Sequence, residues 1–131
     1  MRTAAVGFGA LALAMTGCGR EGDRQAVSAV ADGFYTAVQG HHGARACALL
    51  SADTRKALEQ QESDPCAKAV EKLNLHPGRP AVAEVYSTEA SVHLAGGDTV
   101  LLGHTAQGWR ISAAGCQLHG ASQPADCELQ D

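Results

Sequence analysis

Asp32 and Tyr35 are the residues whose types and spacing come nearest to an acid–base pair. On a helix, residues three apart lie on one side, so a carboxylate there could accept a proton while a phenol donates a hydrogen bond. The carboxylate would need an apolar pocket that raises its pKa toward neutrality. The alternative is a solvated Asp32 beside a core Tyr35 whose hydroxyl reaches the surface. We favour the alternative, because the spacing identifies no second carboxylate.

Histidines are the other candidates for chemistry. His41 and His42 are adjacent, so in an extended loop they point in opposite directions and chelate a metal poorly. His93 and His104 fall on neighbouring predicted strands, where they could face each other. By alternation, however, His93 is out of phase with its apolar neighbours, which indicates the solvent face. We expect no metal site and no cofactor, and the sequence contains neither a Gly-x-Ser-x-Gly elbow nor a phosphate-binding glycine loop.

The first residues of the chain are arranged like an export signal. Arg2 supplies a positive charge, residues 4–15 are apolar or glycine, and two small residues precede Cys18. The apolar run is shorter than the roughly 20 residues that span a bilayer as a helix. We therefore expect residues 1–17 to be a signal peptide and not a permanent transmembrane helix.

Cys18 makes this signal resemble that of a bacterial lipoprotein. Met15-Thr16-Gly17-Cys18 is similar to the lipobox, an aliphatic residue and two small residues before a cysteine. The resemblance implies cleavage before Cys18, a thioether-linked diacylglycerol on its sulfur, and an acyl chain such as palmitate on the new amino terminus. Several acyl chains hold a protein stably on a membrane. The expected location is the outer face of the cytoplasmic membrane; the alternative is an ordinary signal peptide cut near a cysteine.

Four further cysteines remain, Cys47, Cys66, Cys116 and Cys127. An even number in an exported chain predicts two disulfides. Of the three connectivities, local spacing favours Cys47–Cys66 and Cys116–Cys127, and each bond would contribute about 3 kcal/mol to stability. A zinc site would want a CxxC knuckle or a close Cys/His pair, and the sequence has none.

The exported part has the length of one small domain. Its basic residues are scattered, so no basic stripe indicates a nucleic acid partner. Aromatic residues make up only 4% of the chain, which predicts a small core that disulfides would help to stabilise. We expect a polar, lipidated tether over residues 18–24 and a single domain over 25–131.

Hydrophobic periodicity predicts helices first and strands afterwards. Apolar residues recur at helical spacing from Ala26 to Val38, and further helices are predicted at 44–50, 51–61 and 66–73. After Pro80 the period changes to two, which predicts strands at 81–88, 89–94, 99–104 and 109–116. A hairpin turn is expected at 95–98. This order favours an α+β domain with N-terminal helices packed on one face of a four-stranded antiparallel meander.

Three segments, in this order, carry a resemblance to a known family: Phe34-Tyr35 through Leu50, Cys66-Ala-Lys-Ala-Val70, and Gly108-Trp109-Arg110 through Cys116. They look like small actinobacterial lipoproteins that are similar to the nuclear-transport-factor-2-like (SnoaL-like) superfamily of cone-shaped α+β domains. The resemblance covers about residues 25–116 and implies a curved sheet that wraps a helix and leaves a cavity at its open end. Members of the superfamily use that cavity differently or close it, so the fold alone does not give the function.

Three functions are compatible with these features. The first is a non-enzymatic accessory domain that binds a protein partner at the membrane surface, and we favour it because no catalytic set is recognisable. The third and least favoured function is an isomerase or hydratase that uses Asp32 as its base. The second-ranked function is a small-ligand binder, whose open pocket would be lined by Phe34, Val85, Val92, Leu102 and Trp109.

Overall fold

The computed structural model describes residues 19–119 and 126–131, and it has an α+β fold. The expected signal peptide and Cys18 lie outside the described residues. Helices come first along the chain: α1 Arg20–Gln39, α2 Gly43–Cys47, α3 Ala52–Glu62, α4 Cys66–Ala69 and a single 3₁₀ turn η1 Val70–Lys72. Strands follow: β1 Pro80–Tyr86, β2 Glu89–Leu94, β3 Thr99–Thr105, β4 Gly108–Gln117 and β5 Asp126–Gln130.

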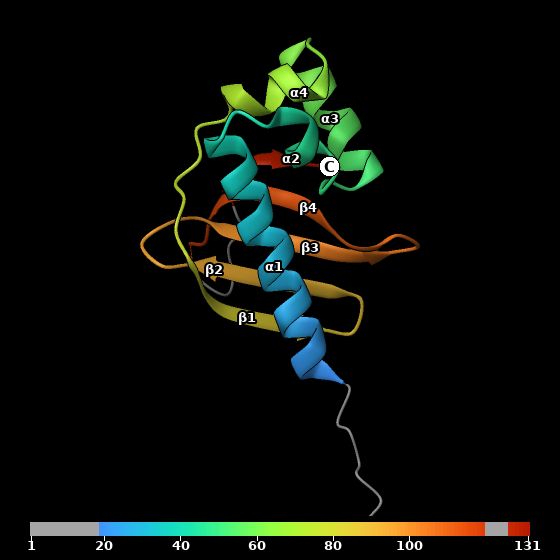
Figure 1. Ribbon diagram of the computed structural model, residues 1–131, viewed down its shortest axis with the longest axis vertical. Helices are drawn as coiled ribbons and strands as arrows, with labels where there is room; N and C mark the ends of the chain where they lie inside the picture. Colours follow the sequence, from blue (N-terminus) through green and yellow to red (C-terminus); the bar gives the residue numbers. More distant parts are fainter. Residues whose placement is uncertain (1–18, 120–125) are drawn as a thin grey trace, which may run out of the picture.

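The long helix α1 lies across one face of the sheet (Figure 1). Its apolar residues recur every three or four positions and face the sheet, which explains why the segment is helical and where it packs. The helix begins at Arg20, so residues 20–24, which we expected to be a tether, form its first turns. Acidic Glu21 and Asp23 suit the positive end of the helix dipole there. Among the described residues, no helix is long and apolar enough to cross a membrane.

The sheet is a meander in which each strand pairs antiparallel with the next, in the order β1-β2-β3-β4-β5. The prediction of four strands is therefore wrong, because β5 adds to β4. In β5, Cys127 and Leu129 alternate with polar residues, which is the pattern of a strand with one buried face, so the expectation overlooked this short signal. Cys127 lies directly opposite Cys116 in the β4–β5 register, and the two form a disulfide.

The short helices form a group at one end of the molecule (Figure 1). The disulfide Cys47–Cys66 joins α2 to α4, as the spacing favoured. The predicted helix 66–73 is shorter and tightens into the 3₁₀ turn after Ala69. Ser51 caps α3, because its hydroxyl accepts the N–H of Thr54 at 3.2 Å. Backbone bonds of 2.9 Å join Ser51 N to Ile111 O and Ile111 N to Leu49 O, which fixes this helical end to β4.

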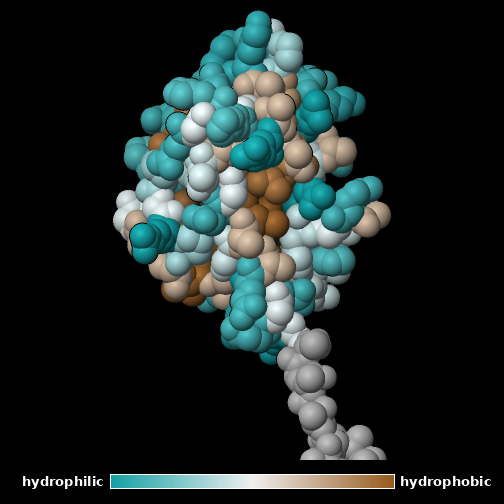
Figure 2. All heavy atoms as spheres, viewed as in Figure 1, coloured by the Kyte–Doolittle hydropathy of each residue, from teal (hydrophilic) through white to brown (hydrophobic). Residues whose placement is uncertain are grey.

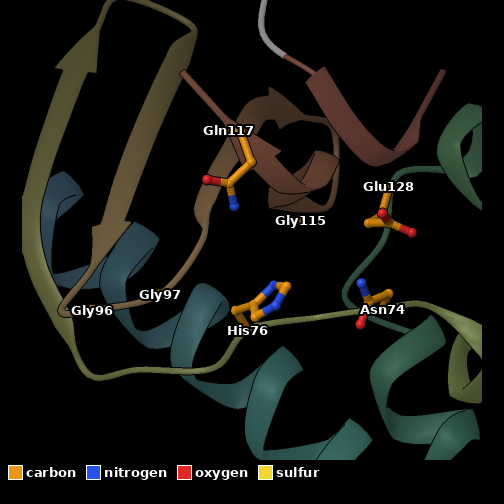
Figure 3. A pocket seen from close by; sticks show the side chains of 7 residues that line it. All are labelled: Asn74, His76, Gly96, Gly97, Gly115, Gln117 and Glu128. Carbon is orange, nitrogen blue, oxygen red and sulfur yellow. The ribbon is translucent and has the colours of Figure 1, made fainter. Parts of the chain in front are cut away.

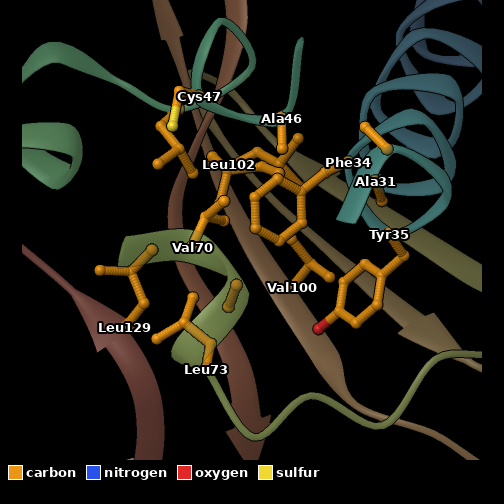
Figure 4. Close-up of a cluster of buried hydrophobic side chains, with 14 of the residues drawn as sticks. Ala31, Phe34, Tyr35, Ala46, Cys47, Val70, Leu73, Val100, Leu102 and Leu129 are labelled. Carbon is orange, nitrogen blue, oxygen red and sulfur yellow. The ribbon is translucent and has the colours of Figure 1, made fainter. Parts of the chain in front are cut away.

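The core fills the space between the helices and the sheet. Phe34 of α1 and Leu102 of β3 are almost completely buried in it, and Phe34 packs edge-on against Tyr35 (Figure 4). Burial of large apolar side chains of this kind is the main favourable term in folding. On the face seen in Figure 2, polar residues cover most of the surface and apolar residues appear as patches in its middle.

Candidate functional site

A buried carboxylate, Asp98, is the centre of the most developed polar cluster in the described structure. It is 1% exposed and lies at the turn between β2 and β3. Its Oδ2 accepts hydrogen bonds from the Tyr35 hydroxyl at 2.9 Å and from the His76 backbone N–H at 2.7 Å. Its Oδ1 accepts one from Gln117 Nε2 at 3.2 Å and lies 3.4 Å from His76 Nδ1. Partners that donate on both oxygens suit the ionised carboxylate.

Close backbone contact between two loops places Asp98 there. The segment before β1 lies against the β2–β3 turn: Asp98 N donates to His76 O at 2.9 Å, and Ala95 N donates to Arg79 O at 2.8 Å. A Cβ on Gly97 would lie 2.5 Å from His76 O, so this approach requires glycine. The carboxylate thus ties the loop that follows the helices to α1, to the turn and to β4.

Tyr35 is a buried partner of Asp98 and not a surface phenol. Its side chain is 3% exposed, and its oxygen accepts the N–H of Gly115 at 3.2 Å while its O–H donates to Asp98. Burial, followed by the negative charge of Asp98, raises the pKa of Tyr35 far above its ordinary value. The expectation that the hydroxyl reaches the surface is therefore wrong. A phenol held neutral in this way fixes the geometry and does not release its proton in the physiological pH range.

Asp32 lies elsewhere. Its side chain is exposed on α1 and borders a shallow hollow with Arg79 and Pro80. The hydroxyl of Tyr35 points into the cluster of Asp98 instead. The structure therefore does not bring Asp32 and Tyr35 together as a pair.

The residues that we expected to line a cone cavity belong to the core. Phe34 and Val92 are fully buried, while Leu102 and Trp109 are 2% and 6% exposed. Val85 is half-buried and packs against the same core. These side chains therefore contact one another and their core neighbours.

Trp109 is fixed in the core by contacts at its edge. Its Nε1 donates to Asp23 Oδ1 at 3.2 Å, which connects the first turn of α1 to the start of β4. The ring of His104 meets it edge-on with centroids 5.0 Å apart. Both contacts hold the indole in one position above the sheet.

The histidines do not assemble a metal site. In the sheet register His93 pairs with Thr99 and His104 pairs with Trp109, so the suggestion that the two histidines face each other is wrong. His93 is half-buried, and its Nδ1 lies 2.9 Å from Thr99 Oγ1. Over residues 19–119 and 126–131, no group of three or more His, Cys, Asp or Glu side chains is placed to bind a metal ion.

A polar pocket of about 470 Å³ opens beside Asp98. Four side chains, from the loop before β1 and from the last two strands, face its space, as Figure 3 shows. No part of this pocket was predicted from the sequence. The one signal for it was glycine at two places, Gly96 and Gly97 in the predicted turn and Gly115 within a predicted strand, which indicates that backbones approach closely there. Its lining residues are Asn74, His76, Gly96, Gly97, Gly115, Gln117 and Glu128.

Comparisons of the chain with models of known protein families, with characterised proteins and with solved structures give no match.

Proposed function

We propose that this chain is an exported lipoprotein, cleaved before Cys18 and held by acyl chains on the outer face of the cytoplasmic membrane. Its domain is a non-enzymatic accessory module that binds a protein partner there. The cone shape of the nuclear-transport-factor-2-like superfamily is part of the same proposal. In this chain the space inside the cone is filled by side chains.

The closed core is the observation that carries the proposal. Phe34, Leu102 and Trp109, which would line a ligand cavity in an open cone, are each at most 6% exposed. The buried carboxylate of Asp98 is held by donors from the protein itself. Catalysis by a general base requires a group within hydrogen-bond reach of a substrate. An accessory module that acts through its surface requires no such group.

The two disulfides support the proposed location outside the cytosol. Cys47–Cys66 and Cys116–Cys127 use all the cysteines that follow Cys18, and structural disulfides persist in oxidising compartments outside the cytosol. The start of α1 at Arg20 puts the folded domain two residues after the expected lipidation site. A domain attached so closely would meet its partner at the membrane surface.

Strand β1 is the surface that we expect the partner to use. In the described part of the chain it ends the sheet and pairs with β2 alone, and it leaves Val82 and Tyr86 51% and 63% exposed. The opposite end of the sheet is better covered, because Gln61 of α3 donates to the backbone oxygen of Glu128 in β5. An edge strand offers unpaired N–H and C=O groups, and an extended segment of a partner can add to it as a further strand.

Two measurements in a bacterial host test the proposal: whether the chain is anchored to the membrane, and whether β1 crosslinks to a partner. The full chain should fractionate with membranes, and Cys18→Ser should not be lipidated. A photo-crosslinking amino acid at Tyr86 should capture a protein partner in the membrane fraction. The same group at Gln60, an exposed position on α3, is the matched control. A chain that is not lipidated, or a Tyr86 position that crosslinks no more than Gln60, would contradict the proposal.

A further inference from the structure

The register of β1 identifies the backbone groups that its outer edge presents. Tyr86 and Glu89 pair across a two-residue turn, so their backbone groups bond to each other. Because the direction of hydrogen bonding alternates along a strand, the N–H and C=O groups of Ala83 and Val85 point away from β2. In the described part of the chain no strand pairs with them, and Figure 1 shows β1 at the outer edge of the sheet. A strand that adds here would bond to these two residues.

The face of the sheet turned away from α1 is acidic along this edge. Glu84 and Tyr86 point to that face, since Val85 between them packs against the core. Glu89 of β2, the cross-strand neighbour of Tyr86, is exposed on the same face. Strands β1, β2 and β3 contain no lysine or arginine. The two carboxylates therefore give this edge a negative charge at neutral pH.

Tyr86 holds the carboxylate of Glu84 at the edge. Its hydroxyl donates to Glu84 Oε2 at 2.9 Å, and Oε1 can accept a further hydrogen bond from a lysine or arginine. A residue of an added strand opposite Glu84 would form a non-hydrogen-bonded pair with it, because the bonded pairs fall at Ala83 and Val85. Side chains are closest in such pairs, and opposite charges there stabilise the pairing.

A second copy of this chain is a poorer occupant of the edge. Antiparallel pairing about a two-fold axis at Ala83, Glu84 or Val85 would place the two Glu84 side chains opposite or diagonal to each other on one face. Like charges so placed destabilise the pairing. Pro80, at the start of β1, has no N–H to donate to an added strand. A basic segment of another protein would instead meet charges of opposite sign.

We propose that the edge of β1 binds an extended segment of the partner in which basic residues alternate with apolar residues. The segment adds as a sixth strand, with a basic side chain opposite Glu84 and apolar ones opposite Ala83 and Val85. This inference rests on the proposed protein partner at β1 and states the chemistry by which that partner is recognised.

An NMR titration of the isotope-labelled full chain with blocked eight-residue peptides tests this recognition. The probe alternates lysine with valine, and the charge control alternates glutamate with valine. The backbone control is the probe with N-methyl groups on its valines, whose N–H groups would bond to Ala83 and Val85. With the probe we expect saturable shifts in β1 and slowed hydrogen exchange at the amides of Ala83 and Val85. Both controls should bind at least about tenfold more weakly.

Variants identify the carboxylates responsible. The double substitution Glu84→Gln and Glu89→Gln should weaken binding of the probe about three- to tenfold, because contacts between opposite charges are lost. Glu128→Gln is the matched control and should leave the affinity unchanged, since this exposed glutamate lies on the strand at the other edge of the sheet. All three glutamates are exposed, so the substitutions leave the core intact.

Absence of saturable shifts with the probe, equally tight binding of either control peptide, or an unchanged affinity in the double variant would overturn the inference. Slowed exchange at Ala83 and Val85 that depends on protein concentration without peptide would also overturn it, because a second copy would then occupy the edge. If the photo-crosslinker at Tyr86 captures a partner while the probe does not bind, the proposed function stands and this inference fails.

Discussion

At the scale of single residues, Asp98 is the buried carboxylate that connects α1, the loop before β1 and β4. Side chains of Tyr35 and Gln117 and the backbone of His76 all donate to it, and the carboxylate itself is 1% exposed. A buried charge is tolerated only when it is hydrogen-bonded in this way. The contribution of Asp98 to the free energy of unfolding can therefore be measured by replacing its carboxylate with a neutral group of the same shape.

Asp98→Asn should destabilise the protein strongly. The new NH₂ group would face either the Tyr35 and His76 donors or Gln117, whose carboxamide would have to turn its oxygen toward it. The negative charge that strengthens the remaining hydrogen bonds is lost in either case. The expected loss in the free energy of unfolding is about 2–4 kcal/mol. Urea denaturation followed by circular dichroism measures it. Asp32→Asn, an exposed change of the same kind, should stay within about 0.5 kcal/mol; equal effects of the two substitutions would argue against the role of Asp98.

Tyr35 predicts how stability changes at alkaline pH. Its folded pKa lies far above the ordinary value of 10.0, so above pH 10 the phenol ionises in the unfolded chain and not in the folded one. The contribution of Tyr35 to the free energy of unfolding is fully present below pH 10, and it is lost as the pH rises toward the folded pKa. Stability should therefore fall by up to about 1.4 kcal/mol per pH unit from this residue.

Denaturation between pH 8 and 11 checks this dependence. Tyr35→Phe removes the ionisable group, so its decline above pH 10 should be shallower than that of the unaltered protein. Tyr86→Phe is the matched control, because Tyr86 is 63% exposed and its hydroxyl contacts only Glu84 among the described residues. The prediction fails if the Tyr35→Phe protein loses stability as steeply as the unaltered one.

At the scale of elements, the contact between the loop before β1 and the β2–β3 turn is one of the connections between the helical half and the sheet. The helices lie before this loop and the strands after it. Gly97 in the turn lies against the backbone of His76 and Pro77 in the loop. A side chain there has no space unless the loop moves. The loop and the turn would then separate, and Asp98 would lose its partners.

Gly97→Ala should therefore cost about 1–3 kcal/mol, as overpacking against neighbouring atoms usually does. Gly103→Ala in β3 is the control, since a Cβ there meets nothing within 4 Å. That change should be neutral or slightly stabilising, because alanine restricts the unfolded chain. Thermal denaturation of both variants is the measurement. If the Gly97→Ala protein is as stable as the Gly103→Ala protein, the loop before β1 can move aside without loss of stability, and the prediction is wrong.

The elements also differ in how far the sequence predicts them. The periodicity of α1 and the alternation in β2 to β4 depend on a buried face, so their positions could be read from apolar residues alone. Strand β5 was missed although Cys127 and Leu129 alternate with polar residues there, because the signal is only five residues long and Leu129 is its one buried side chain. Helix α1 was predicted to start too late because its first turns are polar.

The candidate site was harder to predict than the elements. Asp98 was correctly placed near a turn, yet its burial depends on a loop more than twenty residues earlier that brings His76 to it. Glu128 reaches the pocket only because β5 pairs with β4. The pairing of cysteines was predictable because short separations, 19 and 11 residues, favour local bonds.

At the scale of the whole molecule, the described residues form a small α+β domain that is crosslinked by two disulfides and has a filled interior. The edge of β1 is the surface proposed for a protein partner, and that proposal presupposes a folded, exported domain. The proposed anchor at Cys18 decides where such a domain acts.

The intact mass of the chain extracted from membranes tests the anchored, exported state most directly. We predict a protein that begins at Cys18, carries a diacylglycerol and a further acyl chain, and is lighter by two hydrogens for each of its two disulfides. Cys18→Ser is the matched control and should give no lipidated form. A mass without lipid, starting at a residue other than Cys18 or matching fully reduced cysteines, would contradict the account.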